Sequence, residues 1–304
     1  MIKIGTNPIA WSNDDMQEIG GETSLQTCLQ EAAAAGYAGI ELGHKFPREA
    51  VALKAELAPH ELDLISGWYS SFLLDRSAED EIAHMQPHLA LLKAMGCGVM
   101  VWAECSGAIH GDRLMPLSRR PRMAAADWEG FSQKLTQVAN YLADQGVAMA
   151  YHHHMGTVIE TEDEVCKLME MTGDTVGLLL DTGHISFAGG NPGRLTEKFK
   201  HRIRHFHAKD IRSDVARAAV HQDKSFLEAV LDGVYTVPGD GNIDYRPLFY
   251  SLFGANYQGW VVVEAEQDPE KANPFIYARK GYDYLRQTLQ ETGFSIAGKK
   301  GDIE

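Results

Sequence analysis

The sequence predicts one α/β domain of the (β/α)8 TIM-barrel class, and three observations lead to this prediction. Eight short apolar runs, often introduced by glycine, alternate with longer segments of helical periodicity. No linker or low-complexity run divides the 304 residues, a length that a closed α/β barrel often reaches as one unit. The composition, 44% hydrophobic and 23% charged, is that of a globular chain with a substantial core.

The expected strands are short, and most end in ionisable side chains. They are expected over residues 2–8, 37–43, 63–69, 98–104, 147–154, 176–184, 202–210 and 259–266. A parallel strand that feeds a helix is the repeating unit of such a barrel.

Helical segments separate these strands and follow the last one. They are expected near residues 23–35, 48–60, 79–95, 124–145, 161–172, 193–200, 215–231 and 245–255, with a closing helix near 275–291. Thr161 stands three residues before Glu164, a capping-box pattern that starts a helix directly after the fifth strand. The polar loop over 111–123 is a candidate lid, and 291–304 is expected to be a loose tail.

The charge of the chain excludes some classes of partner. Acidic residues outnumber basic residues by 42 to 28, which gives a formal net charge of -14. Such a field repels phosphate backbones and anionic lipid, so neither nucleic acid nor a membrane is an expected partner.

Cysteine usage and the N-terminus indicate a cytoplasmic protein. The cysteines have no C-x-x-C spacing, which argues against a disulfide framework or a zinc ribbon; they are Cys28, Cys97, Cys105 and Cys166. The first residues lack the pattern of a signal peptide. No window supplies the roughly 18 apolar residues of a membrane span.

Ionisable residues gather at the predicted C-terminal ends of the strands, where parallel α/β barrels place their active sites. Residues two apart on a strand share a face, so three pairs are expected to point inward together. These pairs are His152 with His154, His205 with His207, and Glu264 with Glu266. Imidazole and carboxylate groups that converge from several strands suit a divalent cation such as Mn²⁺, Co²⁺, Mg²⁺ or Zn²⁺.

Each of these residues also has a structural interpretation. A single histidine at a strand end, such as His44 or His205, is usually a satisfied polar residue. Asp181 is different, because it ends a fully apolar strand where an unpaired carboxylate would be costly; metal ligation or ion pairing is expected there. The same argument applies to Glu264, which follows three valines.

Two further residues have equally good alternatives. Lys209 fits a catalytic role and an ion pair with the adjacent Asp210 equally well. Trp68, near the end of the third strand, fits the floor of a pocket for a sugar-like ring as well as it fits core packing.

Several stretches resemble known families. "LLLDTGH", "HFHAKD", "PGDGNIDY" and "GWVVVEAE" resemble the xylose-isomerase-like barrel superfamily, which includes sugar isomerases, epimerases and DNA repair enzymes of the endonuclease IV type. "IGTNPIAWSNDD", "ELGHKFP", "SGWYS", "VWAECSGAIHGD" and "YHHHMGTVIET" are similar to the inosose dehydratase family of inositol catabolism. The resemblance spans nearly the whole chain, although a superfamily fold alone does not assign a reaction.

The resemblance implies one divalent metal, preferably Mn²⁺ or Co²⁺, held by strands five to eight. Three residues match its ligand positions: Asp181, His207 and Glu264. Related isomerases have a glutamate as the fourth ligand, and His152 stands at that position here. Either His152 is the ligand, or Glu160 folds back from the following loop. Glu160 is favoured, because it supplies a charge-compensating acid and frees His152 and His154 for substrate.

The resemblance also implies a reaction, the elimination of water from 2-keto-myo-inositol (scyllo-inosose) to give 3D-trihydroxycyclohexane-1,2-dione. The metal would polarise the ketone. Glu264, His152 or His184 would serve as the base, and a protonated imidazole or Lys209 as the acid. The expected substrate contacts are His154, Glu104 and Trp68.

The nearest alternative is a metal-dependent sugar or keto-polyol isomerase or epimerase, because the same ligands serve both reactions. A sugar-binding regulator without turnover is a second alternative, motivated by the altered fourth ligand. The net charge of -14 opposes an apurinic endonuclease. Superfamily analogy suggests a homodimer or homotetramer.

Overall fold

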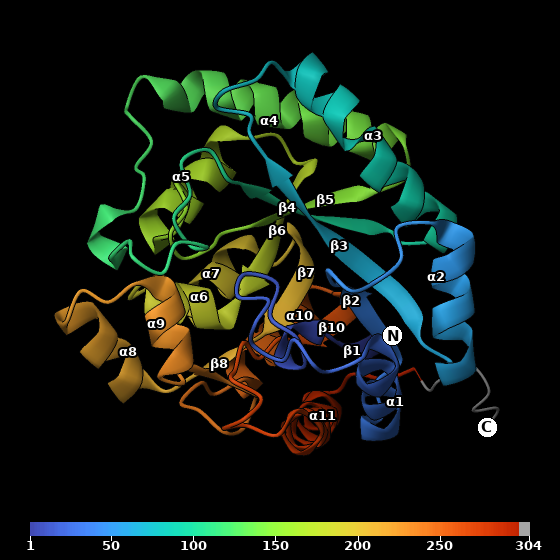
Figure 1. The fold of residues 1–304 in the computed structure, drawn as a ribbon. Helices are drawn as coiled ribbons and strands as arrows, with labels where there is room; N and C mark the ends of the chain where they lie inside the picture. The colour runs from blue at the N-terminus through green and yellow to red at the C-terminus, as the bar shows by residue number, and fades with distance from the viewer. Residues whose placement is uncertain (298–304) are drawn as a thin grey trace.

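The computed structural model describes residues 1–297, and within them eight parallel strands close into a barrel that helices surround (Figure 1). The order around the barrel is β1-β10-β7-β6-β5-β4-β3-β2. The strands are β1 (Ile2–Thr6), β2 (Gly39–Leu42), β3 (Asp63–Ser71), β4 (Val99–Glu104), β5 (Ala148–His152), β6 (Val176–Asp181), β7 (Ile203–Ala208) and β10 (Gly259–Val263). Each overlaps its predicted run, so the predicted barrel is confirmed.

Helices cover the outside of the barrel. They are α1 (Leu25–Ala35), α2 (Ala50–Leu57), α3 (Ala78–Met95), α4 (Asp127–Asp144), α5 (Glu162–Met171), α7 (Pro192–Phe199), α10 (Arg246–Gly254) and α11 (Pro274–Glu291). Short 3-10 helices occupy Pro8–Ala10, Ala58–His60 and Leu117–Arg119. The predicted capping box is present at the start of α5, where Thr161 accepts from the backbone N–H of Glu164 and the Glu164 carboxylate accepts from that of Thr161.

The predicted boundary of the sixth strand is wrong. β6 ends at Asp181, and a short helix, α6 (Thr182–Phe187), follows at once. The Asp181 side chain caps this helix, since its Oδ1 accepts from the backbone N–H of His184 at 2.8 Å. His184 therefore lies on a helix and not on a strand.

The helix predicted over 215–231 is two helices, α8 (Ser213–His221) and α9 (Phe226–Leu231). The chain turns between them at Asp223, where φ is 48°, and Ser225 begins the second helix with a capping box. A small antiparallel sheet of β8 (Asp210–Ile211) and β9 (Tyr235–Thr236) joins the two ends of this excursion, which lies to one side of the barrel (Figure 1).

Period-two alternation fixes which strand residues face the interior. Val101, Ala150 and Leu179 pack together inside the barrel, and the intervening residues of the same strands belong to the larger core between strands and helices. His152 and Asp181 stand two residues beyond Ala150 and Leu179, so both point inward above this small core.

The described part of the predicted tail is more ordered than expected. Ile296 forms a parallel bridge with Ile2, and the backbone N–H of Ala297 donates to the carbonyl of Ile2. The rest of that prediction, residues 298–304, lies outside the described residues. Among the described helices, none combines the length and the apolar character that crossing a membrane requires.

Candidate active site

A cavity of about 280 Å³ opens at the C-terminal ends of the barrel strands. This is near the lower end of the size range of small-molecule sites. Trp68, His110 and His154 line it as one group of rings, with 5.5 Å between the ring centroids of Trp68 and His154 and 4.9 Å between those of His110 and His154. The carboxylates of Asp15 and Glu266 also line it. The structure therefore brings two of the three expected substrate contacts, Trp68 and His154, to the cavity.

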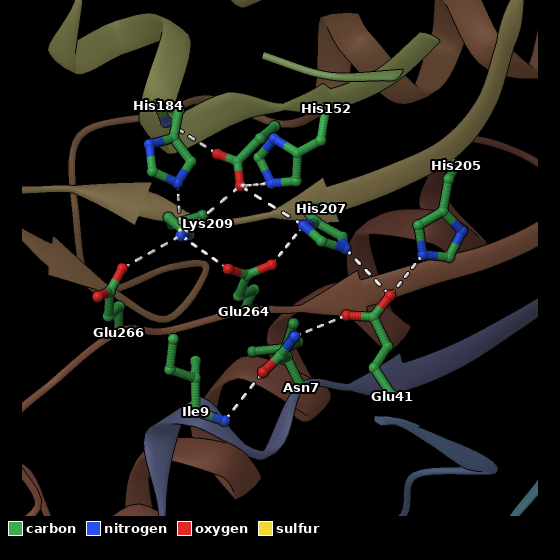
Figure 2. Close-up of polar contacts among 12 residues, drawn as sticks. Asn7, Ile9, Glu41, His152, His184, His205, His207, Lys209, Glu264 and Glu266 are labelled. Atoms are coloured by element: carbon green, nitrogen blue, oxygen red, sulfur yellow. Dashed lines mark hydrogen bonds and ion pairs between the residues drawn. The ribbon is translucent and has the colours of Figure 1, made fainter. Parts of the chain in front are cut away.

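A buried cluster of imidazoles and carboxylates adjoins this cavity, and His207 and Glu264 belong to both (Figure 2). Asp181 Oδ2 lies 3.6 Å from His207 Nδ1 and 3.8 Å from His152 Nε2. His207 Nδ1 is also in direct contact with Glu264 Oε2. One atom from each of His152, Asp181, His184 and Glu264 lies within 4.8 Å of the others.

The donor atoms of this cluster fit a divalent cation. Asp181 Oδ2, His207 Nδ1 and Glu264 Oε2 are buried and face one another as ion-pair partners, and within the described part of the chain none forms a hydrogen bond of regular geometry. Buried polar atoms without regular hydrogen bonds are costly, and a bound cation would be a common partner for three that converge on one place. Two carboxylate oxygens and an imidazole nitrogen are a suitable donor set for a hard or borderline divalent metal.

Electrostatics also favours a cation here. Burial alone would lower the pKa of His207, but the carboxylates of Glu264 and Glu41 raise it well above the usual value. Burial would raise the pKa of Glu264, but His207 and Lys209 hold it well below the usual value. Glu264 therefore remains ionised, and the negative charge around His207 favours the binding of a cation there.

Lys209 is fully buried within the same cluster (Figure 2). Its Nζ lies 2.8 Å from Glu264 Oε1 and 3.0 Å from His184 Nε2. Burial would lower the pKa of Lys209, but Glu264 and Asp181 raise it, so the ammonium stays charged. Gly183 makes room for this side chain, because a Cβ there would lie 2.5 Å from Lys209 Cγ.

Asp210 does not pair with Lys209, which was one of the two alternatives for that lysine. Its carboxylate instead accepts from four backbone N–H groups, those of Ile211, Gly239, Gly241 and Ile243. The stretch "PGDGNID" is therefore a loop wrapped around a buried carboxylate. Gly241 is required for the close approach, since a Cβ there would lie 2.3 Å from Asp210 Oδ1.

Glu160, the favoured fourth ligand, lies outside the cluster. Its Oε1 is 3.0 Å from Arg120 Nε, and its Oε2 accepts from the backbone N–H of Gly156 at 2.7 Å. Burial raises the pKa of Glu160 to about 7 in spite of these partners. The loop after β5 directs this carboxylate toward the β4–α4 segment, whose position cannot be predicted from local sequence patterns.

Glu104, an expected substrate contact, faces away from the cavity. It shares the outer face of β4 with Met100 and Trp102, which pack in the core between strands and helices. Its carboxylate accepts from the Ser71 hydroxyl and the backbone N–H of Leu73. The prediction fails because the acidic strand end alone does not reveal which face the last residue occupies.

The candidate lid over 111–123 contacts two neighbouring segments, the turn between α8 and α9 and the start of α5. The backbone N–H of Leu117 donates to the carbonyl of Lys224, and Arg120 also reaches Glu164, with 2.8 Å between Nη2 and Oε1. These contacts place His110, just before the segment, at the cavity.

His110 and Asp15 are site residues that the sequence pattern does not predict, because they come from loops after β4 and β1. Gly156, at φ 78°, allows the loop after β4 to pass close by, since a Cβ there would lie 2.9 Å from the backbone nitrogen of His110.

The loop after β1 also contacts Glu266. Asn13 Nδ2 donates to Glu266 Oε1 at 3.3 Å, and burial raises the pKa of Glu266 to about 8.

The closed parallel barrel and the ligand-type cluster at its C-terminal end agree with the result of sequence comparison. The chain belongs to the xylose isomerase-like TIM barrel family, whose sequence model matches residues 29–291. Among similar curated proteins is the rhizopine catabolism protein MocC of Rhizobium meliloti, 47% identical over 296 residues, or 97% of this chain and 91% of that protein. Inosose dehydratase of Geobacillus thermodenitrificans is 43% identical over 289 residues, or 94% of this chain and 97% of that protein. These relatives confirm the resemblance to the inosose dehydratases.

Solved structures with the same fold are more distant in sequence. IOLI protein with a bound zinc atom has a TM-score of 0.65 and 17% identity, covering 95% of this chain and 97% of that chain. The probable 3-DHS dehydratase AsbF of Bacillus anthracis has a TM-score of 0.66 and 15% identity, covering 93% and 98%. At this identity the likeness concerns the fold alone.

Proposed function

We propose that this protein is a metal-dependent inosose dehydratase, a hydro-lyase that eliminates water from 2-keto-myo-inositol. The observation that carries the proposal is the convergence of Asp181 Oδ2, His207 Nδ1 and Glu264 Oε2, which are buried and lack regular hydrogen bonds, beside a small cavity. Full-length relatives named inosose dehydratase support the choice of reaction. A reducing cytoplasm suits the chain, whose described cysteines are all free.

His152 replaces Glu160 as the proposed fourth metal ligand beside Asp181, His207 and Glu264. His152 Nδ1 lies 2.6 Å from the carbonyl oxygen of His153, which can only accept, so the ring hydrogen is on Nδ1. The lone pair of Nε2 then faces Asp181. Burial lowers the pKa of His152 to about 3, which keeps that lone pair available.

Mn²⁺ or Co²⁺ is the proposed metal, although nitrogen and oxygen donors also admit Mg²⁺ and Zn²⁺. When bound, the cation supplies Lewis acidity that polarises the substrate ketone and acidifies the adjacent C–H bond.

The residues that line the cavity are assigned the proton transfers. His154 lines the cavity and is assigned as the base for the proton on the carbon next to the ketone, and burial, which lowers its pKa well below the usual value, keeps its imidazole neutral. Glu266, protonated up to about pH 8, is a suitable acid for the departing hydroxyl, which leaves as water. His184 and Lys209 are assigned the role of holding the cluster in place and take no part in the proton transfers. Lys209 donates to Glu264 and contacts His184.

The assay follows the product. Pure protein is incubated with 2-keto-myo-inositol in the presence of Mn²⁺, Co²⁺, Mg²⁺ or Zn²⁺, and in parallel with a chelator. The proposal expects the ultraviolet absorbance of a conjugated enol-dione to rise with metal and not with chelator. Conversion of the substrate without this chromophore would instead identify an isomerase or epimerase, since those reactions expel no water.

A further inference from the structure

The carboxylate of Glu41, at the end of β2, is buried and saturated with hydrogen bonds (Figure 2). Its Oε1 lies 2.6 Å from Ser66 Oγ, 2.8 Å from His205 Nε2 and 3.2 Å from His207 Nε2. Its Oε2 accepts from Asn7 Nδ2 at 2.8 Å. These donors come from β3, from β7 and from the end of β1, and an ionised carboxylate can accept from all of them.

This arrangement determines how His207 presents its ring. A carboxylate that is ionised only accepts hydrogen bonds, so His207 Nε2 carries the ring hydrogen that it donates to Glu41. In the neutral imidazole, the lone pair is then on Nδ1. Nδ1 is the atom that faces Asp181 and Glu264, and in the described part of the chain it forms no hydrogen bond of regular geometry.

We propose that Glu41 is a positioning residue that fixes the tautomer and ring orientation of His207, so that Nδ1 is offered to the metal. The inference rests on the metal site of the proposed function. Carboxylates that accept from the distal nitrogen of a metal-binding histidine raise its basicity, and their loss typically lowers metal affinity about 10- to 100-fold.

The neighbours of Glu41 support this assignment over a second metal site at the same place. Glu41, His205 and His207 have ligand-like spacing. However, the Nε2 atoms of both histidines lie at hydrogen-bond distance from one Glu41 oxygen, and a ring nitrogen that donates a hydrogen bond has no lone pair for a cation. His205 therefore serves to hold the Glu41 carboxylate in place.

Asn7 extends the network toward the cavity. It donates to Glu41, and its Oδ1 accepts from the backbone N–H of Ile9 at 2.9 Å (Figure 2). The loop that Asn7 begins also carries Asp15, which lines the cavity. Asn7 and Glu41 line the cavity themselves, so Glu41 links a metal ligand to the segment that forms one side of the cavity.

The test compares Glu41→Gln with Glu104→Gln. Glu104 is a matched control, because it is an equally buried strand-end carboxylate with hydrogen-bond donors but faces away from the cavity. After chelator treatment, Co²⁺ binding is measured by titration calorimetry, and the visible spectrum of bound Co²⁺ reports the ligand geometry. The expected result is a 10- to 100-fold weaker affinity and an altered spectrum for Glu41→Gln, with wild-type behaviour for Glu104→Gln.

A second measurement requires no folded variant at position 41. In ¹⁵N-histidine-labelled wild-type protein loaded with Zn²⁺, long-range ¹H–¹⁵N spectra identify the tautomer of His207, assigned by the signal that is missing in His207→Gln. Hydrogen on Nε2 is expected. Hydrogen on Nδ1, two ions per chain, no ion bound to the wild type, or wild-type Co²⁺ affinity in Glu41→Gln would each overturn the proposal. These readouts are independent of turnover, so a protein that binds Co²⁺ as expected but forms no enol-dione would contradict only the proposed function.

Discussion

The guanidinium of Arg120 lies 3.0 Å from the carboxylate of Glu160 and joins the β4–α4 segment to the loop after β5. The ion pair therefore occupies the carboxylate of Glu160, which the sequence suggested as the fourth metal ligand. We therefore expect Glu160→Gln to bind one Co²⁺ per chain with near wild-type affinity, whereas His152→Ala binds it far more weakly. Titration calorimetry on chelator-treated protein measures both. A loss of binding in Glu160→Gln alone would return Glu160 to the ligand set.

Asp181 has two roles that one substitution can separate. In Asp181→Asn the Oδ1 atom still accepts from the N–H of His184, but the amide nitrogen is no metal ligand. We expect metal content and dehydratase activity to be lost together, as in His207→Ala, while the cap of α6 is kept. Asp181→Ala also removes the cap, at a further cost of about 1 kcal/mol. Metal analysis, activity and urea unfolding measure these effects, and an intact rate without metal would contradict the scheme.

Removal of the Lys209 ammonium leaves Glu264 and Asp181 without their buried cation. We expect Lys209→Met to lose about 3–5 kcal/mol of unfolding free energy, the usual effect of breaking a buried ion pair. Added Mn²⁺ should recover part of this loss, because it neutralises the same carboxylates. The control is Lys198→Met, which breaks an exposed pair with Glu170. Equal, small losses in both variants would mean that Lys209 does not stabilise the cluster.

His153 should make the fold sensitive to acid. It is fully buried, and burial lowers its pKa to about 4, below the usual 6.5. Between these values the unfolded chain binds a proton that the folded chain does not, so stability falls as the pH falls from 6.5 to about 4. Over this pH range the free energy of unfolding falls by at most about 3 kcal/mol because of this one histidine.

His153→Gln should therefore show a shallower decline over this window. Urea unfolding is measured with chelator present, so that metal-linked protons do not contribute. The comparison variant is His201→Gln, on the exposed turn after α7. A decline in His153→Gln as steep as that of the wild type would contradict the prediction.

Alanine substitutions at two glycines can distinguish the effect of backbone strain from the effect of crowding at the cavity. Gly156 and Gly146 both have φ 78°, where a side chain costs about 1–2 kcal/mol. A Cβ at Gly156 would lie 2.9 Å from the His110 nitrogen, but a Cβ at Gly146 would have no atom within 4 Å among the residues described. We expect Gly156→Ala to raise KM by displacing His110 and Gly146→Ala to keep the wild-type KM. Equal kinetics in the two variants would contradict a contact between His110 and the substrate.

The sequence predicted the barrel because short apolar runs alternate with helical segments, and most of these runs end in an ionisable residue. It singled out Asp181 and Glu264 because an acid after an apolar strand needs a partner, and the structure places both in the buried cluster. It missed α6, because the apolar residues continue past Asp181 through Ile185 and Phe187. The cap that starts this helix is visible only in three dimensions.

The remaining errors concern long-range partners. Glu160 was misplaced because its partner, Arg120, lies far away in the sequence, and Glu104 because the register of β4 decides its direction. The assignment of Nδ1 of His207 to the metal likewise depends on Glu41 from another strand. Local patterns carry no information on such pairs.

The cap at Asp181 has an entropic consequence. A free carboxylate samples several rotamers, and ordering a side chain on binding costs about 0.5–1.5 kcal/mol. Here the N–H of His184 holds one oxygen, so the rotamer is selected when α6 forms. Folding thus orders this ligand in advance, and a cation that arrives at Asp181 loses little of its binding free energy to immobilising the side chain.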